Sequence, residues 1–398
     1  MSKPIKAAAK IAVGAGAAFL ALGEIVYEGV INISMNNKIR STGAFDNPDE
    51  KNFWETNELV AEAEAWYDAK AAGDTVLAST RIRRNTYAKV YFPEEKSNKW
   101  AIVIHGYTDS PRGMAHYAKT YYEMGFNVIM PHMIGHGSDK SHYTSMGYYD
   151  KLIILDWIDY ILARDKDAKI VLHGVSMGSA TTMMTTGEKI PANVVAAVAD
   201  CGYTSAWEEY YTQVKPMFHL PPAPVVTSAN IISKLRGNFD FKEAAPIKAV
   251  VHSTTPTLFI HGDGDTFVPY SMMKPLYEAC SAPDKEMLTV PGAFHAASAY
   301  FDNDLYWNTV KKFIGKYVEV PEVSAEPKEE VKSEAAIAIE KAVAKLESED
   351  AKAEEEPAAE EKPKAAAKPK KAQPKKAKKK EAPKEETPEP ADAEETAE

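Results

Sequence analysis

The sequence predicts an α/β fold: a doubly wound, mostly parallel β-sheet with helices on both of its faces. Two observations predict it. Along residues 85–318, short apolar runs alternate with longer amphipathic segments, and short loops join them, as in successive βα units. Most of the short runs are apolar throughout, which is typical of strands that are buried on both faces of a parallel sheet.

The first half of this region predicts three strands and two helices. Residues 86–93 alternate between polar and apolar, and residues 99–106 form an uninterrupted apolar run that ends at a glycine. Residues 114–125 predict a helix that also ends at a glycine, and residues 126–131 predict the next strand. Residues 148–165 are strongly amphipathic and predict the second helix.

The second half continues the alternation but contains an insertion. We expect strands at 169–174, 193–200, 255–262 and 285–292, and helices at 177–187, 269–280 and 300–318. Residues from about 203 to 248, which are rich in aromatic residues and proline, interrupt the pattern and predict an inserted cap.

The N-terminal residues 1–33 predict a signal-anchor or transmembrane segment. Lys3, Lys6 and Lys10 precede an apolar run over residues 11–23. Because the apolar character resumes after this run, we expect an uncleaved anchor rather than a cleaved signal and a secreted protein. The lysines predict a single pass through the cell membrane, with the body on the extracytoplasmic side. An amphipathic helix packed on the body is the alternative.

Two further segments flank the expected sheet. Residues 34–84 are polar with helical patches and predict an N-terminal helical extension. Residues 319–398 consist mainly of Ala, Glu, Lys and Pro, and predict a disordered tail because they cannot form a core. Residues 362–380 contain ten lysines and no acidic residue. The tail is therefore either a solvating segment or an attachment to an anionic wall polymer or membrane surface.

The composition excludes other classes of protein. Residues 1–318 carry 34 acidic and 31 basic side chains. This near balance gives no electrostatic support for nucleic-acid binding. The chain has only two cysteines, so neither a disulfide framework nor a cysteine zinc spacing is present.

One serine stands between two glycines where a strand is expected to pass into a helix, in Gly174-Val175-Ser176-Met177-Gly178. A nucleophile at such a turn has a strained backbone, so its neighbours two residues away must lack bulk. The helix that begins at Met177 would direct its N-terminal amides at a developing oxyanion. We therefore identify Ser176 as a candidate nucleophile.

A candidate acid and a candidate base follow two later strands. The segment HGDGDTFVP at 261–269 contains Asp263 and Asp265. Calcium would need six to eight oxygen ligands, and this loop lacks a closing glutamate, so orienting an imidazole is the better role for a carboxylate here. The segment VPGAFHAAS at 290–298 contains His295. The order Ser, Asp, His along the chain is the order that α/β-hydrolases use.

These motifs resemble the α/β-hydrolase superfamily over roughly residues 85–318. Three further segments carry the likeness. VIHGYTDSP at 103–111 is similar to the family's HG oxyanion loop. MIGHGSD at 133–139 is similar to its R-G-H-G-x-S turn, with Ile134 in place of the arginine. HGDGDTFVP is similar to its H-G-x-x-D-x-x-V-P loop, which selects Asp265 over Asp263. The N-terminal anchor, the elbow and ADC at 199–201 are similar to bacterial membrane-attached, serine-aminopeptidase-like hydrolases.

The resemblance implies a serine hydrolase without a cofactor. Ser176 would attack a carbonyl, His295 would transfer the proton, and Asp265 would orient His295. The amides of Met177 and Tyr107 would form the oxyanion hole, with Tyr107 supplied by the resemblance.

The other histidines have no catalytic role in this interpretation. We expect His105 to shape its loop and His173 to pack in the core. We expect no metal at His132 and His136, because the glycines beside His136 oppose the helix that a metal pair with this spacing needs.

The expected substrate is a carboxylic ester or, second, a small amide. An aminopeptidase-like peptidase is one alternative, and it would need acidic residues to hold an α-amino group, for which Glu208 and Glu209 in the cap are candidates. A catalytically idle, anchored binding protein is the other alternative. Aromatic residues of the cap would contact an apolar acyl or aryl group or simply pack against the body: Trp207, Tyr210, Tyr211, Phe218 and Phe239.

Overall fold

A computed structural model describes residues 3–43, 47–70 and 72–321, without the side chains of residues 3–12, 217 and 218. The chain divides into a unit of residues 1–325 and a unit of residues 326–398, and the described residues all belong to the first. The interpretation of 362–380 as an anionic-surface attachment, and nearly all of the expected tail, therefore lie outside the described residues.

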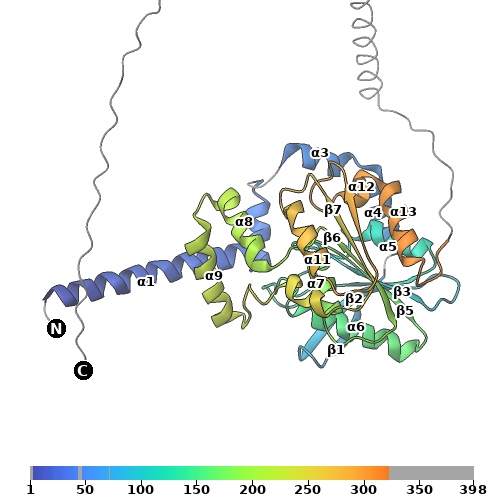
Figure 1. Ribbon diagram of the computed structural model, residues 1–398, viewed down its shortest axis with the longest axis horizontal. Helices are drawn as coiled ribbons and strands as arrows, with labels where there is room; N and C mark the ends of the chain where they lie inside the picture. The colour runs from blue at the N-terminus through green and yellow to red at the C-terminus, as the bar shows by residue number, and fades with distance from the viewer. Residues whose placement is uncertain (1–2, 44–46, 71, 322–398) are drawn as a thin grey trace, which may run out of the picture. The chain divides into compact units, whose positions relative to one another are not determined.

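The described strands form one eight-stranded sheet in the order β1-β2-β4-β3-β5-β6-β7-β8 (Figure 1). Neighbours from β4 to β8 are parallel, whereas β1 and β2 are antiparallel to their neighbours. The predicted α/β fold with a mostly parallel sheet is confirmed. The strands are β1 (Thr75–Ser79), β2 (Arg84–Tyr91), β3 (Lys99–Ile104), β4 (Asn127–Pro131), β5 (Lys169–Val175), β6 (Val194–Asp200), β7 (Thr257–Gly262) and β8 (Lys285–Val290).

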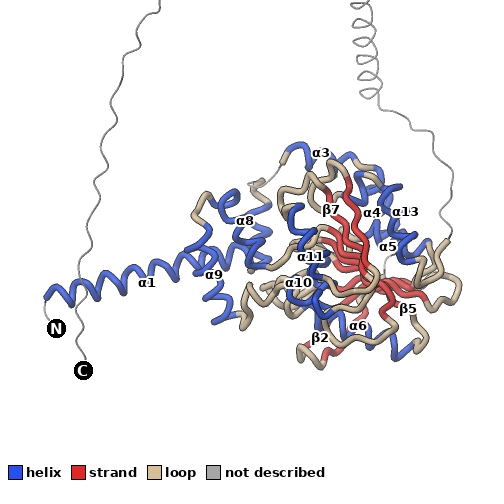
Figure 2. Tube along the Cα trace, in the orientation of Figure 1, coloured by secondary structure: helices blue, strands red, loops and turns tan. Residues whose placement is uncertain are grey.

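Helices cover both faces of this sheet (Figure 2). Along β3, Trp100, Ile102 and Ile104 point to the face that α6 (Asp150–Arg164) and α7 (Met177–Thr186) cover, and the alternate residues point to α5 (Ala115–Glu123) and α13 (Asn303–Ile314). The remaining helices are α1 (Lys3–Val30), α2 (Ile33–Arg40), α3 (Pro48–Thr56), α4 (Glu58–Lys70), α8 (Ala206–Phe218), α9 (Pro222–Arg236), α10 (Pro246–Ala249), η1 (Val250–His252), η2 (Tyr270–Met272), α11 (Met273–Ala279) and α12 (Ser298–Phe301).

The segment before the expected sheet differs from the prediction. Residues 34–84 do contain helices, α2 to α4, but they also contain β1, which forms an antiparallel hairpin with β2 at the edge of the sheet. The sequence of β1, TVLAS, is short and half exposed. An edge strand of this kind lacks the continuous apolar run by which the other strands were recognised.

Helix α7, which follows the expected nucleophile, is buried at every residue. Small residues and threonines make this possible. Thr181 Oγ1 donates to the carbonyl of Met177 at 2.8 Å, and Thr185 Oγ1 donates to that of Thr181 at 2.8 Å. The helix can therefore lie against the sheet with these two hydroxyls satisfied by its own backbone.

Helix α1 has two dissimilar halves. Its residues from Val13 to Val30 are long and apolar enough to cross a membrane. Val13 is 74% exposed, whereas Val26, Tyr27 and Val30 are buried in the core of the body. The helix runs along α9 of the cap (Figure 1).

A glycine permits this close contact between the two helices. A Cβ added at Gly23 would lie 2.1 Å from Ser228 Oγ and 2.6 Å from the Ser228 carbonyl carbon. The end of the predicted anchor is therefore also part of the folded body.

Replacement of Ile31 tests this placement. Ile31 is fully buried, so Ile31→Ala should lower the free energy of unfolding by about 2–5 kcal/mol. Ile25, which is 70% exposed, provides the control, and Ile25→Ala should change it by less than about 0.5 kcal/mol. Chemical denaturation of the full chain in detergent measures both values. Equal effects of the two substitutions would contradict the packing of this segment on the body.

Candidate active site

Ser176 occupies a strained turn between β5 and α7. Its backbone has φ 57° and ψ −117°, in a region that residues with a side chain rarely adopt. A Cβ at Gly174 would lie 2.1 Å from the carbonyl oxygen of Gly178, and a Cβ at Gly178 would lie 2.0 Å from that of Ile104. Neither position can hold a larger residue unless the backbone moves. The two glycines are therefore needed, as predicted, because neither position has space for a Cβ.

The structure brings the three predicted residues together. His295 Nε2 lies 2.9 Å from Ser176 Oγ, and His295 Nδ1 lies 2.7 Å from Asp265 Oδ2. Each residue follows the carboxyl end of a different parallel strand, β5, β7 or β8. The side chain of Asp265 is fully buried, while that of His295 is 19% exposed. A proton can therefore pass from Ser176 to His295 while Asp265 holds the other ring nitrogen.

Asp265 is held by more donors than the sequence revealed. Its Oδ1 accepts from the amides of Phe267 at 2.9 Å and Val268 at 3.0 Å. Its Oδ2 also lies 3.1 Å from His261 Nε2. Burial alone would raise the pKa of Asp265, but the charge of His295 and the hydrogen bonds from His261 and His295 outweigh it and hold the pKa at about 2. Asp265 is therefore ionised at neutral pH.

The neighbouring Asp263 stabilises a turn and does not contact His295 in any hydrogen bond given by the structure. Its Oδ1 accepts from the amide of Gly292 at 2.6 Å, near the surface. The choice of Asp265 over Asp263 as the partner of His295 agrees with this geometry. Sequence reasoning missed His261, although its position four residues before Asp265 at the end of a buried strand was a usable signal.

The predicted oxyanion loop passes close to Ser176. A Cβ at Gly106 would lie 3.3 Å from the Cβ of Ser176. Thr108 has φ 61°, and its amide donates to His136 Nε2 at 3.0 Å. Burial lowers the pKa of His136 to about 4, so its ring is neutral at pH 7 and can accept this bond. His136 therefore fixes the loop that carries Tyr107.

Two more contacts fix the same region. His105 Nε2 accepts from the amide of Met133 at 3.1 Å, in the loop-shaping role that we expected. Tyr107 Oη donates to the carbonyl of Val30 at 2.6 Å, which ties the loop to the end of α1. Met177 is the first residue of α7, so its amide has no acceptor within the helix.

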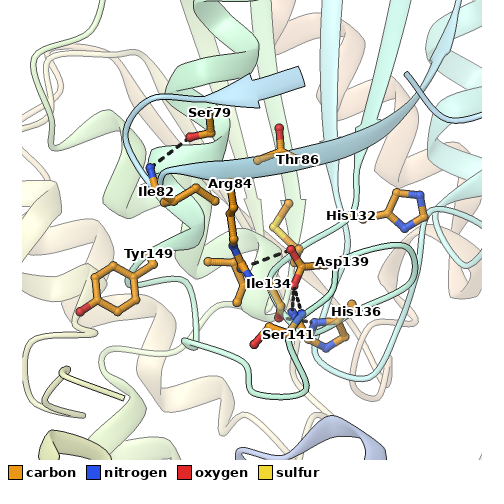
Figure 3. A network of polar contacts seen from close by, with 12 residues as sticks. Ser79, Ile82, Arg84, Thr86, His132, Ile134, His136, Asp139, Ser141 and Tyr149 are labelled. Carbon is orange, nitrogen blue, oxygen red and sulfur yellow. Dashed lines mark hydrogen bonds and ion pairs between the residues drawn. The ribbon is translucent and has the colours of Figure 1, made fainter. Parts of the chain in front are cut away.

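An arginine from a neighbouring strand fixes the turn at 133–139 (Figure 3). Ile134 stands where the family pattern has arginine, and Arg84 from β2 reaches the turn and pairs with Asp139 at 3.2 Å. Asp139 Oδ1 also accepts from the amides of Gly135 at 3.0 Å and Ser141 at 2.9 Å. His132 lies apart from His136 in Figure 3 and contacts Asp74 at 3.2 Å.

A buried network lies beneath the elbow. His173, expected to pack, also bonds through its ring, with Nδ1 3.0 Å from Tyr121 Oη and Nε2 2.9 Å from Tyr306 Oη. Tyr306 Oη donates to Asp200 Oδ2 at 2.9 Å, and the Asp200 carbonyl accepts from the amide of Ser176 at 2.9 Å. Burial raises the pKa of Asp200 to about 6. Sequence reasoning did not identify this network, because its members come from separate elements.

Ser176 lines two cavities. The outer one, of about 700 Å³, has charged residues such as Arg40, Glu50 and Asp109 on its walls. The inner one has a volume of about 30 Å³, and Glu209 lines it. Glu208, the other expected candidate, is exposed and accepts from the hydroxyl of Thr204.

The cap aromatics have different surroundings. Tyr210 lines the inner cavity. Trp207 lies under Lys242, Tyr211 is 43% exposed, and Phe239 packs against Phe241. The side chain of Phe218 lies outside the described residues. Among the described members of this set, only Tyr210 lines a cavity with Ser176.

One group of possible metal ligands occurs among the described residues. It consists of Cys201, Asp265 and His295, with ligand atoms within 4.8 Å of one another. Asp265 and His295 already bond to each other. Burial raises the pKa of the Cys201 thiol, and a metal binds the thiolate. This group is therefore poorly suited to a metal.

Comparisons with known proteins find the same fold and similar sequences. A family model described as alpha/beta hydrolase fold matches residues 100–223, and one described as serine hydrolase (FSH1) matches residues 179–296. The uncharacterized protein YqkD of Bacillus subtilis (strain 168) is 26% identical over 214 residues, 54% of this chain and 70% of that protein. A thermostable monoacylglycerol lipase of Bacillus sp. (strain H-257) is 20% identical over 258 residues, 57% of this chain and 94% of that protein. The Pyrococcus furiosus esterase Pf2001 shares the fold, with a TM-score of 0.50 and 19% identity over 61% of this chain and 92% of that chain.

Asp200→Asn should raise the stability at pH 8 relative to that at pH 4.5. Because the folded-state pKa is raised from 3.8 to about 6, the folded protein keeps a proton that the unfolded chain releases. The stability from Asp200 is therefore fully present below about pH 4 and is lost as the pH rises through about 6, on the order of 3 kcal/mol. Asn cannot ionise and does not lose this contribution. Urea titrations at pH 4.5 and 8 give the change in the free energy of unfolding between the two pH values, which should favour pH 8 more in the variant than in the parent. An equal change in both proteins would contradict the assignment.

Proposed function

The chain belongs to the α/β-hydrolase superfamily and is a hydrolase, and on this basis we propose that it is a serine hydrolase that cleaves carboxylic esters. Ser176 is the proposed nucleophile, His295 the proposed base and acid, and Asp265 the group that orients His295. The observation that carries the proposal is the pair of contacts of 2.9 Å and 2.7 Å that link these three side chains. The proposed reaction uses no metal or cofactor.

In the first half of the proposed reaction, Ser176 Oγ attacks the ester carbonyl carbon and its proton moves to His295 Nε2. The negative charge that develops on the carbonyl oxygen is stabilised by the amides of Met177 and Tyr107. The bond to the alcohol oxygen then breaks, and His295 returns its proton to the departing alcohol. Ser176 remains acylated.

In the second half, water replaces the alcohol. His295 takes a proton from the water as its oxygen attacks the acyl carbon, and the proton then passes to Ser176 Oγ as the carboxylic acid leaves. Ionised Asp265 stabilises the positively charged ring in both halves. The relative that is named a monoacylglycerol lipase supports an ester over an amide as the scissile bond.

Labelling with a fluorophosphonate tests the nucleophile. The full chain should be labelled, Ser176→Ala should not be labelled, and His295→Ala should react about a thousandfold more slowly because Ser176 loses its base. In-gel fluorescence measures the rates.

The two aspartates of one loop give a matched control. Asp265→Asn should slow labelling strongly, whereas Asp263→Asn should label at the rate of the parent, because Asp263 bonds only to a turn amide. A folded parent protein that fails to label, or equal rates for the two aspartate variants, would reject the proposed triad.

We also propose that α1 anchors the protein in a membrane and is not removed. Val26, Tyr27, Val30 and Ile31 are buried in the body, so the helix passes directly from the proposed membrane segment into the fold. The 23 residues from Lys3 to Ile25 lie in this helix. At 1.5 Å per residue they would extend about 34 Å, of which the 13 residues between Lys10 and Glu24 carry no charge and extend about 20 Å, so the proposed anchor requires the lysine side chains to reach the headgroups. The N-terminal lysines favour an extracytoplasmic body.

Membrane fractionation tests the anchor. The expressed chain should remain in the membrane pellet after washing with alkaline carbonate, and mass spectrometry should recover peptides from before residue 23. Protease added to intact cells whose outer layers are permeable should degrade the body. Release by carbonate, or a mature N-terminus beyond residue 23, would contradict the anchor.

A further inference from the structure

The inner cavity beside Ser176 contains an unusual concentration of polar atoms without partners. Among the described residues, the buried side-chain atoms that form no hydrogen bond include both carboxylate oxygens of Glu209, Oδ1 of Asn36 and the hydroxyl of Tyr210. All three residues line this one cavity. They are 3%, 2% and 9% exposed, so bulk water does not satisfy them.

Such atoms have a free-energy cost unless something bonds to them. Burying a polar group without a hydrogen bond is unfavourable, and burying an unpaired charge is more so. Elsewhere in the site the carboxylate of Asp265 accepts four hydrogen bonds. Glu209, in contrast, has no hydrogen-bond partner among the described residues, which leaves both of its oxygens open to a ligand.

The side chains around the cavity define the chemistry of that ligand. Asn36 Nδ2 donates to the carbonyl of Gly29 at 2.9 Å, which leaves its Oδ1 as the acceptor for the cavity. Glu209 adds a carboxylate, and the residues that line the cavity include no Lys, Arg or His. The lining therefore offers acceptors, and a carboxyl group that can ionise, to a group that donates hydrogen bonds.

Aromatic rings add a preference for a cation. Tyr107, Tyr203, Tyr210 and Phe267 line the same cavity, and the faces of such rings attract cations. The volume of about 30 Å³ exceeds the roughly 10–15 Å³ that one water molecule needs. A primary ammonium group therefore fits this space.

We propose that the inner cavity is a subsite for a primary ammonium group of the substrate, with Glu209 as its counter-ion and Asn36 as a second acceptor. This proposal rests on the proposed function and names its substrate class: an ester that bears a small, protonated amine close to the scissile bond. Tyr107 forms part of both the oxyanion loop and the subsite, so a bound ammonium group would lie next to the reacting carbonyl.

The proposal has a distinct pH dependence. Burial, and secondly the charge of Asp265, raise the pKa of Glu209 well above its ordinary value, so the empty subsite holds a neutral acid. An ammonium group binds the ionised form of Glu209, so Glu209 releases its proton to the solvent when the ammonium group binds. Affinity for ammonium should therefore increase as the pH rises from about 5 to 8, whereas affinity for an alcohol, which binds the neutral acid equally well, should not.

Ethylammonium is the probe for this subsite. Calorimetric titration of the full chain in detergent, at constant ionic strength, should show that ethylammonium binds at least about tenfold more tightly than ethanol. Trimethylammonium, which has the same charge but one N–H donor in place of three, should bind more weakly than ethylammonium. Ethylammonium should also inhibit hydrolysis of 4-nitrophenyl acetate with the same affinity.

Two adjacent glutamates provide the matched variants. Glu209→Gln keeps the size of the side chain but removes the counter-ion, so the ratio of ethylammonium to ethanol affinity should fall about tenfold. Glu208→Gln, in the same turn of α8 but exposed, should keep the ratio of the parent. Binding of ethanol as tight as that of ethylammonium, an unchanged ratio in Glu209→Gln, or no saturable binding of ethylammonium would overturn the proposal.

The two proposals fail in different ways. Calorimetry detects the subsite without turnover, so it decides on the ammonium group even if no ester is hydrolysed. A protein that labels with fluorophosphonate but does not bind ethylammonium would keep the proposed function and lose the subsite. A protein that binds ethylammonium through Glu209 but never labels would keep the subsite and lose the proposed reaction.

Discussion

The backbone of Ser176, with its positive φ, is the constraint on which the site depends. A side chain in that conformation is unfavourable by roughly 1–3 kcal/mol and persists only where its surroundings determine it. Those surroundings are a buried parallel sheet on one side and the fully buried α7 on the other. Gly174, Gly178 and Gly106 provide the clearance. The sheet and the helix therefore force the hydroxyl into the position where His295 meets it.

Parallel strands explain why residues so far apart in sequence converge. Ser176, Asp265 and His295 each lie in the segment that follows β5, β7 or β8, at the same edge of the sheet. The proposed oxyanion loop follows β3, the neighbour of β5. The N-terminal segment adds an unusual support, since Tyr107 bonds to Val30 and Asn36 lines the inner cavity. The end of the proposed anchor is thus part of the wall of the site.

The sequence predicted what local chemistry determines and missed what distant contacts determine. Continuous apolar runs predicted the parallel strands, and glycines at fixed spacing around Ser176 predicted the elbow, because both signals lie within a few residues. The edge strand β1 was missed, since half-exposed strands carry no such run. The network of His173, Tyr306 and Asp200 joins three separate elements. No local pattern encodes it.

The cap also contains a difference in burial that the sequence could not predict, and this difference bears on function. Glu208 and Glu209 are adjacent and equivalent in sequence, yet one faces solvent and the other the cavity beside Ser176. Asp265 and Glu209 are both buried, but the charge of His295 and the hydrogen bonds from His261 and His295 lower the pKa of Asp265, whereas burial and the charge of Asp265 raise that of Glu209. Burying a carboxyl group without hydrogen-bond partners does not stabilise the folded protein. The fold therefore fixes Asp265 beside His295, whereas it leaves Glu209 open to the ammonium group that we propose.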